Sequence, residues 1–275
     1  MTVDAVFDPL PTLAPAPAPA AAPAALPPGA IARLELLLRD PAAFLAALDR
    51  VEASPHADAA AAALARALVG AVAVGAGLFG VVVGAHRGGL QVIFCAVKVP
   101  LILLVTLVVC AAPFLAFAHA ARLPLTARAV ITLALASSAR FALVLLGLAP
   151  FVWLMEGWSL GYHRVILAVV AVCAAAGVAA GRVLFSGLAR FGGAGTRVGL
   201  AFVAVFGLVG AQTSWILRPF VLRPRTEGVP FVRALEGDFL DALGTTARSA
   251  MRRDDGRPPP PARRPLPDCR SAPCD

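Results

Sequence analysis

Three charged side chains interrupt the apolar part of this sequence and are its candidates for chemistry inside a membrane. Lys98 is the only lysine beside 23 arginines, Arg140 lies within a run of apolar residues, and Glu156 is the only acid between Asp58 and Glu227. An ionisable side chain in a membrane span is costly and normally faces the bundle interior, a partner charge or a conduction path. Lys98 and Glu156 could form an ion pair, and all three residues could line a path for an ion or solute.

The sequence GWSLG at residues 157–161 suggests a second chemistry, because it matches the G-x-S-x-G pattern of serine hydrolases. That pattern works as a nucleophile elbow only between a strand and a helix, with a histidine and an acid brought in from later in the chain. Here apolar helices are predicted on both sides. We therefore expect a loop and no enzymatic activity. The aromatic residues around it suit an interfacial belt: Trp153, Trp158 and Tyr162.

The five cysteines do not form a metal-binding or redox pattern. Cys95, Cys110 and Cys173 lie in apolar runs, where cysteine behaves as a small hydrophobic residue. Cys269 and Cys274 lie near the C-terminus without CxxC spacing. We expect neither a metal ion nor a cofactor.

The composition indicates a helical membrane protein. Hydrophobic residues make up 59% of the 275 positions and charged residues 15%, against about 25% charged residues in soluble domains. Long apolar runs separated by arginines are typical of transmembrane helices. We predict an all-α polytopic membrane bundle of about five transmembrane helices, with amphipathic flanking helices and disordered termini. The predicted spans are about residues 63–85, 99–118, 129–155, 163–184 and 198–217.

Outside the spans, composition divides the chain further. A Pro/Ala-rich start is typical of a disordered arm. In the amphipathic part that follows, Asp40 is a suitable helix N-cap ahead of Pro41 at the first helical position. The predicted divisions are a disordered arm at 1–28, amphipathic cytosolic helices at 29–62, the bundle at 63–220, an amphipathic juxtamembrane segment at 221–253 and a disordered basic tail at 254–275.

The apolar run from Gly88 to Ala118 is too long for one straight span. Its 31 residues would make a helix of about 46 Å, whereas the hydrocarbon core is about 30 Å thick. The residue before a proline avoids helical angles, so we expect a break at Pro100, with a shallow segment at 88–98. Lys98 would then lie at the membrane edge, either as an anchor that reaches water or bonded into the bundle. The residues alone leave both interpretations of Lys98 open.

Arg140 has no such position at an edge, since the apolar pieces on either side, 11 and 15 residues, are too short to span alone. We expect it to face the bundle interior and to bond to carbonyls or to Ser137 and Ser138. It would act as an interhelical clasp or, alternatively, in a substrate or ion path. Two GxxxG pairs predict close helix contacts: Gly80 with Gly84, and Gly177 with Gly181.

Two polar segments carry a family resemblance. The first holds Gln91, Lys98, Pro100, Thr106 and Pro113, and the second, QTSWILRPF, holds Gln212, Trp215, Leu217, Arg218, Pro219 and Phe220. Together they resemble an uncharacterised bacterial multi-pass membrane family with a Q…KxP…T…P segment and a terminal QxxWxLRPF motif, some of whose relatives are labelled Yip-like. The resemblance covers about residues 88–220 and implies a membrane protein without implying a reaction. Because its motif includes the lysine, the resemblance also favours a Lys98 that is bonded into the bundle, since arginine would serve equally well as an anchor. The candidate intramembrane polar positions are Lys98, Arg140, Glu156, Gln91, Gln212, Trp215 and Arg218.

Five spans place the chain ends on opposite sides of a membrane. Nine arginines lie on the N-terminal side of the spans against seven basic residues on the other side. The positive-inside rule then predicts a cytosolic N-terminus and an external C-terminus. The family resemblance implies that the membrane is the bacterial inner membrane.

The expected partners are the lipid bilayer, with a preference for anionic lipid, and other membrane proteins, but no nucleic acid. The sequence favours a non-enzymatic organiser or accessory component of a membrane assembly. The alternative is a small transporter or channel that uses Lys98, Arg140 and Glu156.

Overall fold

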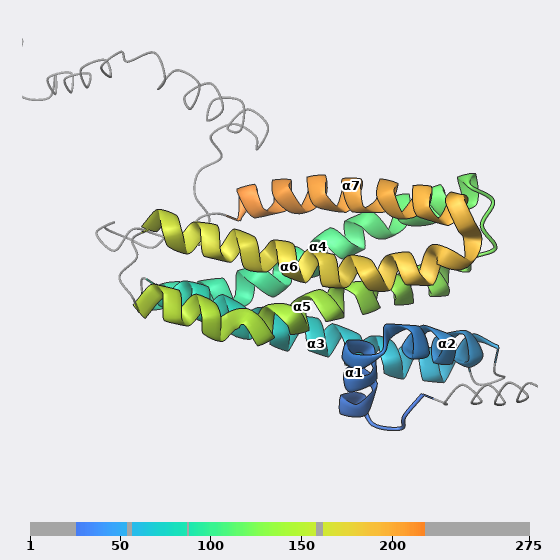
Figure 1. The fold of residues 1–275 in the computed structure, drawn as a ribbon, viewed down its shortest axis with the longest axis horizontal. Coiled ribbons are helices and arrows are strands. Elements are labelled where there is room, and N and C mark those ends of the chain that lie inside the picture. The colour runs from blue at the N-terminus through green and yellow to red at the C-terminus, as the bar shows by residue number, and fades with distance from the viewer. Residues whose placement is uncertain (1–25, 54–56, 87, 158–161, 218–275) are drawn as a thin grey trace, which may run out of the picture.

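The computed structural model describes residues 26–53, 57–86, 88–157 and 162–217. Five long helices, α3 to α7, run up and down side by side, and two short helices, α1 and α2, lie against one side of this bundle (Figure 1). The predicted all-α membrane bundle with amphipathic flanking helices is confirmed. The elements are α1 (Ala30–Arg39), α2 (Pro41–Glu52), α3 (Ala57–Ala85), α4 (Leu90–Ala120), α5 (Ala127–Gly157), α6 (Tyr162–Leu188), the 3-10 turn η1 (Ala189–Phe191) and α7 (Gly192–Ile216).

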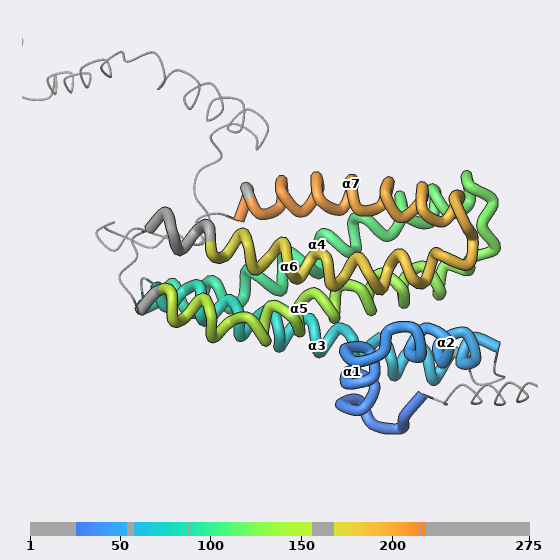
Figure 2. The backbone as a smooth tube through the Cα atoms, in the orientation of Figure 1, coloured from blue at the N-terminus to red at the C-terminus, as the bar shows by residue number. Residues whose placement is uncertain are grey.

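Within the described residues, four continuous helical stretches are long and apolar enough to cross a membrane: Asp58–Ala85, Leu90–Ala120, Ala127–Met155 and Ala168–Ser214. The fourth is a hairpin, because η1 and Gly192, with a φ of 57°, reverse the chain so that α7 returns alongside α4 and α6 (Figure 2). Helices α6 and α7 have 27 and 25 residues, or about 40 and 37 Å at 1.5 Å per residue, so each is long enough to cross alone. The bundle therefore holds five helices of spanning length.

The expected break at Pro100 is wrong, because α4 continues through it as one helix of 31 residues. A proline inside a helix leaves the carbonyl four residues earlier without its intrahelical donor, here that of Ala96. In membrane helices a neighbouring helix can accommodate such a carbonyl. The Ala96 oxygen lies against Gly77 of α3, where a Cβ would be 3.4 Å away. The absence of a side chain at Gly77 thus leaves room for it.

Only one of the two predicted GxxxG contacts exists. A Cβ on Gly80 would overlap the Cys95 carbonyl of α4, and a Cβ on Gly84 would lie 2.6 Å from the Val92 Cα. These glycines therefore let α3 and α4 touch backbone to backbone. A Cβ on Gly177 would meet nothing within 4 Å, so the predicted contact of the second pair is wrong.

Helices α1 and α2, together called the collar, follow the amphipathic pattern expected for residues 29–62. The Asp40 carboxylate accepts a hydrogen bond of 2.9 Å from the Ala43 amide and Pro41 occupies the first turn of α2, which confirms the predicted cap. Leu37 and Phe44 are fully buried in the same apolar cluster as Leu68 of α3. The collar is thus docked on the bundle by its apolar face.

One end of the bundle collects the basic residues. At this end α3, α5 and α7 begin and α4 and α6 end, and the collar lies nearest to it (Figure 1). We call it the arginine-rich end. It and the collar carry Arg33, Arg39, Arg50, Arg66, Arg122, Arg128, Arg182, Arg190 and Arg197. These are the nine arginines that the sequence assigned to the N-terminal side.

Several sequence predictions concern residues outside the described ranges. They include the greater part of the N-terminal arm, loop residues 158–161 of GWSLG, and everything from Arg218 onward, which contains the predicted juxtamembrane segment and tail.

Candidate functional site: the buried polar face of α4

Helix α4 buries a row of polar side chains inside the bundle. Gln91, Lys98 and Thr106 all have an exposed fraction of 0%, and so does Cys95 between the first two. Their spacings of seven and eight residues correspond to about two helical turns each, which places them on one face. Three positions of the first polar segment found in the sequence thus form one continuous strip.

The glycine contact with α3 lies beside the start of this strip. A Cβ on Gly84 would be 2.8 Å from the Gln91 carbonyl oxygen, and Gly80 abuts the Cys95 carbonyl. Within α4 the Gln91 side-chain amide donates a hydrogen bond of 3.2 Å to the Cys95 sulfur. The close approach of two backbones excludes lipid from these polar groups, so the strip is shielded from the hydrocarbon.

At its other end the strip meets α7. The Thr106 side chain lies against Gly210, where a Cβ would be 3.7 Å from the Thr106 methyl carbon and 3.9 Å from its hydroxyl oxygen. The buried Thr106 hydroxyl has no hydrogen-bond partner among the described residues. Gln212, half-buried, follows two residues after Gly210. The first polar segment therefore reaches α7 about a hundred residues later in the sequence, two positions before the second segment begins.

Lys98 lies in the third turn of α4 and is fully buried. An anchor with its ammonium in water requires exposure, so that interpretation is wrong. Glu156 belongs to the last turn of α5, which ends at the same end of the bundle where α4 begins (Figure 1). Its side chain, like that of Trp215, lies outside the description, and pairing of Glu156 with Lys98 stays a prediction.

Arg140 is not part of the polar strip. Its Nη1 donates a hydrogen bond of 3.1 Å to the carbonyl oxygen of Leu37, in the last turn of α1. The expected bond from Arg140 to a backbone carbonyl is confirmed, and it runs from α5 toward the collar. The last carbonyls of a helix lack intrahelical donors and carry partial negative charge, which makes them good partners for a guanidinium. Arg140 is an interhelical clasp that holds α1 on α5.

Two ion pairs join further elements at the arginine-rich end. Asp49 of α2 pairs with Arg190 at 2.5 Å, and Asp58 of α3 pairs with Arg128 at the start of α5 at 2.6 Å. Glu52 lines a cavity of about 230 Å³ between the collar and the bundle, together with Arg190. Burial raises the pKa of the Glu52 carboxyl and Asp49 adds to this, while Arg190 and Arg128 act in the opposite direction. The docked collar thus favours the neutral form of Glu52.

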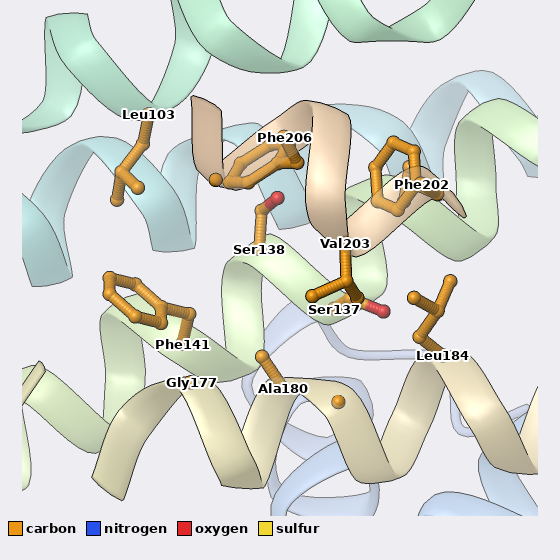
Figure 3. Close-up of a pocket in the computed structure, with 13 residues that line it drawn as sticks. Leu103, Ser137, Ser138, Phe141, Gly177, Ala180, Leu184, Phe202, Val203 and Phe206 are labelled. Carbon is orange, nitrogen blue, oxygen red and sulfur yellow. The ribbon is translucent and has the colours of Figure 1, made fainter. Parts of the chain in front are cut away.

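A second cavity, of about 200 Å³, lies between α6 and α7 (Figure 3). Its lining is almost wholly apolar, with Phe206 and Val203 of α7 facing Gly177 and Ala180 of α6. Of the described residues that line it, only Ser137 and Ser138 of α5 carry hydroxyls. Ser137 donates a hydrogen bond of 3.0 Å to the Leu133 carbonyl, so it is satisfied within its own helix. Lys98 and Arg140, the charged candidates whose side chains the structure describes, do not line this cavity.

Lys98 and Arg140, which a conduction path would have to bring together, point into different parts of the structure. Lys98 lies on the α4 strip near one end of the bundle, whereas Arg140 faces the collar. The described residues contain no group of three or more histidine, cysteine or acidic side chains placed to hold a metal ion. The sequence analysis did not single out three acids of this end, Asp49, Glu52 and Asp58. Nothing in the local sequence distinguishes them from ordinary surface acids of amphipathic helices.

Comparison with known proteins adds no functional assignment. No family model matches this sequence, and no curated protein or solved structure matches it.

Proposed function

We propose that this membrane protein is a non-enzymatic organiser or accessory component of an assembly in the bacterial inner membrane, with the collar on the cytosolic side. The observation that carries the proposal is the bond from Arg140 to the Leu37 carbonyl. Arg140 is the charged residue that the sequence placed deepest in a span, and its guanidinium bonds to the collar instead of lining a transport path. A docked collar offers a surface for neighbouring proteins, and the exposed Ile31 of α1, at 83%, is its most accessible large apolar residue.

Site-specific photo-crosslinking in native membranes tests this role. A photoreactive amino acid replacing Ile31 is expected to give one discrete adduct of higher mass, because it lies on the free surface of the collar. The same amino acid replacing the fully buried Phe44 serves as the matched control and should give only intramolecular products. A ladder of unspecific adducts equal at both positions would contradict the proposal.

The alternative, a small transporter or channel, makes a different prediction. Purified protein in liposomes would then move an ion or solute, and the Arg140→Ala protein would not. The organiser role predicts no flux above that of empty liposomes for either protein. Flux that depends on Arg140 would overturn the proposed function in favour of the transporter.

A further inference from the structure

A shallow groove crosses the seam between the end of α4 and the start of α7. It measures about 470 Å³ and lies at the arginine-rich end, on helices other than those that the collar covers. Its floor is apolar, formed by Phe117 and Ala120 of α4 and by Val198 and Ala201 of α7. Two exposed arginines, Arg122 and Arg197, complete it, and no acidic side chain of the described residues lines it.

The backbone at Arg122 is unusual for an arginine. Its φ is 54°, and it is the only non-glycine residue with a positive φ in the described part of the chain. The Arg122 amide donates to the His119 carbonyl and the Leu123 amide to the Ala118 carbonyl, both at 2.9 Å. This is the Schellman ending of α4, whose left-handed position is normally a glycine because a side chain there is strained. An arginine at this strained position indicates that its guanidinium has a binding role.

Two arginines near the groove have acidic partners, whereas the groove arginines have none among the described residues. Arg128 and Arg190, at the same end, are each paired with an aspartate. Arg197 donates through Nε to the Gly193 carbonyl at 3.3 Å, which leaves its terminal nitrogens available. Among the described residues, neither Arg122 nor Arg197 has an acidic partner. Two guanidinium groups above an apolar floor are complementary to a phosphate attached to a hydrocarbon chain.

We propose that this groove binds an anionic phospholipid, with the phosphate between Arg122 and Arg197 and the upper acyl chain on the apolar floor. The groove lies where two spanning helices end, which is the level of the lipid headgroups. The surrounding excess of arginine selects against zwitterionic lipid, and basic pockets between transmembrane helices on the cytosolic side are suited to acidic headgroups. The inference deepens the proposed function by naming a lipid class, and it rests on the orientation stated there.

Lipid binding to the purified full-length protein in detergent tests the inference, with native mass spectrometry as the readout. The probes are phosphatidylglycerol, phosphatidylcholine and inorganic phosphate. We expect retained phosphatidylglycerol, little phosphatidylcholine, and no competition by millimolar phosphate. A basic residue near a membrane surface contributes about 1 kcal/mol to the attraction of anionic lipid, so Arg122→Gln and Arg197→Gln should each weaken binding about fivefold and the double variant about 25-fold.

The matched control removes the same charge elsewhere at this end. Arg66 and Arg182 are exposed and lie outside the groove, so the Arg66→Gln/Arg182→Gln protein should bind phosphatidylglycerol within about twofold of wild type. Equal loss in both double variants would show a diffuse charge effect and overturn the site. Competition by phosphate with no preference among lipids would show a site for the free anion and overturn it as well.

Arg122→Gly separates lipid binding from folding. Glycine suits the left-handed position, so this variant should have a higher melting temperature than wild type in lipid-free detergent. It should nevertheless lose about fivefold in phosphatidylglycerol affinity. A variant that is more stable and still binds like wild type would contradict the inference. Because the measurement uses purified protein, such a result would leave the crosslinking test of the organiser role unaffected.

Discussion

At the residue scale, the burial of Lys98 decides how arginine would behave in its place. An exposed anchor tolerates either side chain, but Lys98 has no exposed surface. Its ammonium is compact, whereas the guanidinium of arginine is wider and planar and needs a different cavity. Overpacking a buried site typically costs about 1–3 kcal/mol.

We therefore predict that both Lys98→Arg and Lys98→Leu lower the melting temperature in detergent. Leucine loses the bonded ammonium, and arginine does not fit. Thermal unfolding followed by circular dichroism checks this. If the arginine variant is as stable as wild type and only the leucine variant fails, the bonded-lysine hypothesis is wrong.

The raised pKa of Glu52 predicts the direction in which stability changes with pH. Its pKa is raised above the ordinary value of 4.5, chiefly by burial. The folded protein then prefers the protonated acid, so the ionised form destabilises the docked collar. This cost is absent below the unfolded pKa near 4.5 and grows as the pH rises through the folded pKa.

Glu52→Gln should accordingly raise the melting temperature at pH 7, and the gain should shrink as the pH falls toward 4.5. Asp58→Asn is the control of opposite sign, since it removes the pair with Arg128, worth about 0.2–1 kcal/mol for an exposed pair, and Asp58 is not among the groups that shift the Glu52 pKa. Melting curves between pH 4 and 8 measure both. A gain for Glu52→Gln that does not change with pH would speak against burial of an ionised carboxylate as its cause.

At the scale of elements, two glycines in similar sequence patterns should respond oppositely to alanine. Gly80→Ala forces a Cβ into the Cys95 carbonyl, whereas the Cβ of Gly177→Ala meets nothing within 4 Å. The first should destabilise the bundle by about 1–3 kcal/mol. The second should stabilise it by about 0.5–1 kcal/mol, because alanine is the better helix former. Equal effects of the two substitutions on the midpoint of chemical unfolding would refute the backbone contact of α3 with α4.

The docking of the collar depends on Arg140. A hydrogen bond to a charged group contributes about 1.5–3 kcal/mol, so Arg140→Ala should increase amide hydrogen exchange in α1 by one to two orders of magnitude. Ser138→Ala is the control, because Ser138 lies on the cavity side of α5 and makes no bond to the collar in the described structure. Exchange measured by mass spectrometry should rise in α1 and not in α6. A rise in both helices would indicate general loosening instead of a lost clasp.

Several features of these elements follow from the sequence, and others depend on neighbours that a sequence does not reveal. Asp40 caps α2 because the cap is local, and the Gly80 pair makes its contact because small residues permit it. The break expected at Pro100 fails because α3 accommodates the freed carbonyl with Gly77. The partner of Arg140 is 103 residues away, and no local pattern marks a carbonyl at that separation.

At the scale of the whole molecule, the alternating direction of the long helices brings the positive charges to one end of the bundle. The nine arginines come from the collar and from the ends of all five long helices, and up-and-down packing brings them to one end. Part of this charge is neutralised by Asp49 and Asp58, whereas the two groove arginines have no acidic partner among the described residues. The excess positive charge is the physical basis for placing this end in the cytosol.

Reporter fusions along the full chain test that orientation most directly. We predict active alkaline phosphatase when it is fused after residue 89, between α3 and α4, and after residue 275. A fusion after residue 126, between α4 and α5, should give inactive phosphatase and a fluorescent cytosolic GFP. The reverse pattern at 89 and 126, with the arginine-rich end in the periplasm, would contradict the orientation on which the collar's cytosolic role and the lipid site both rest.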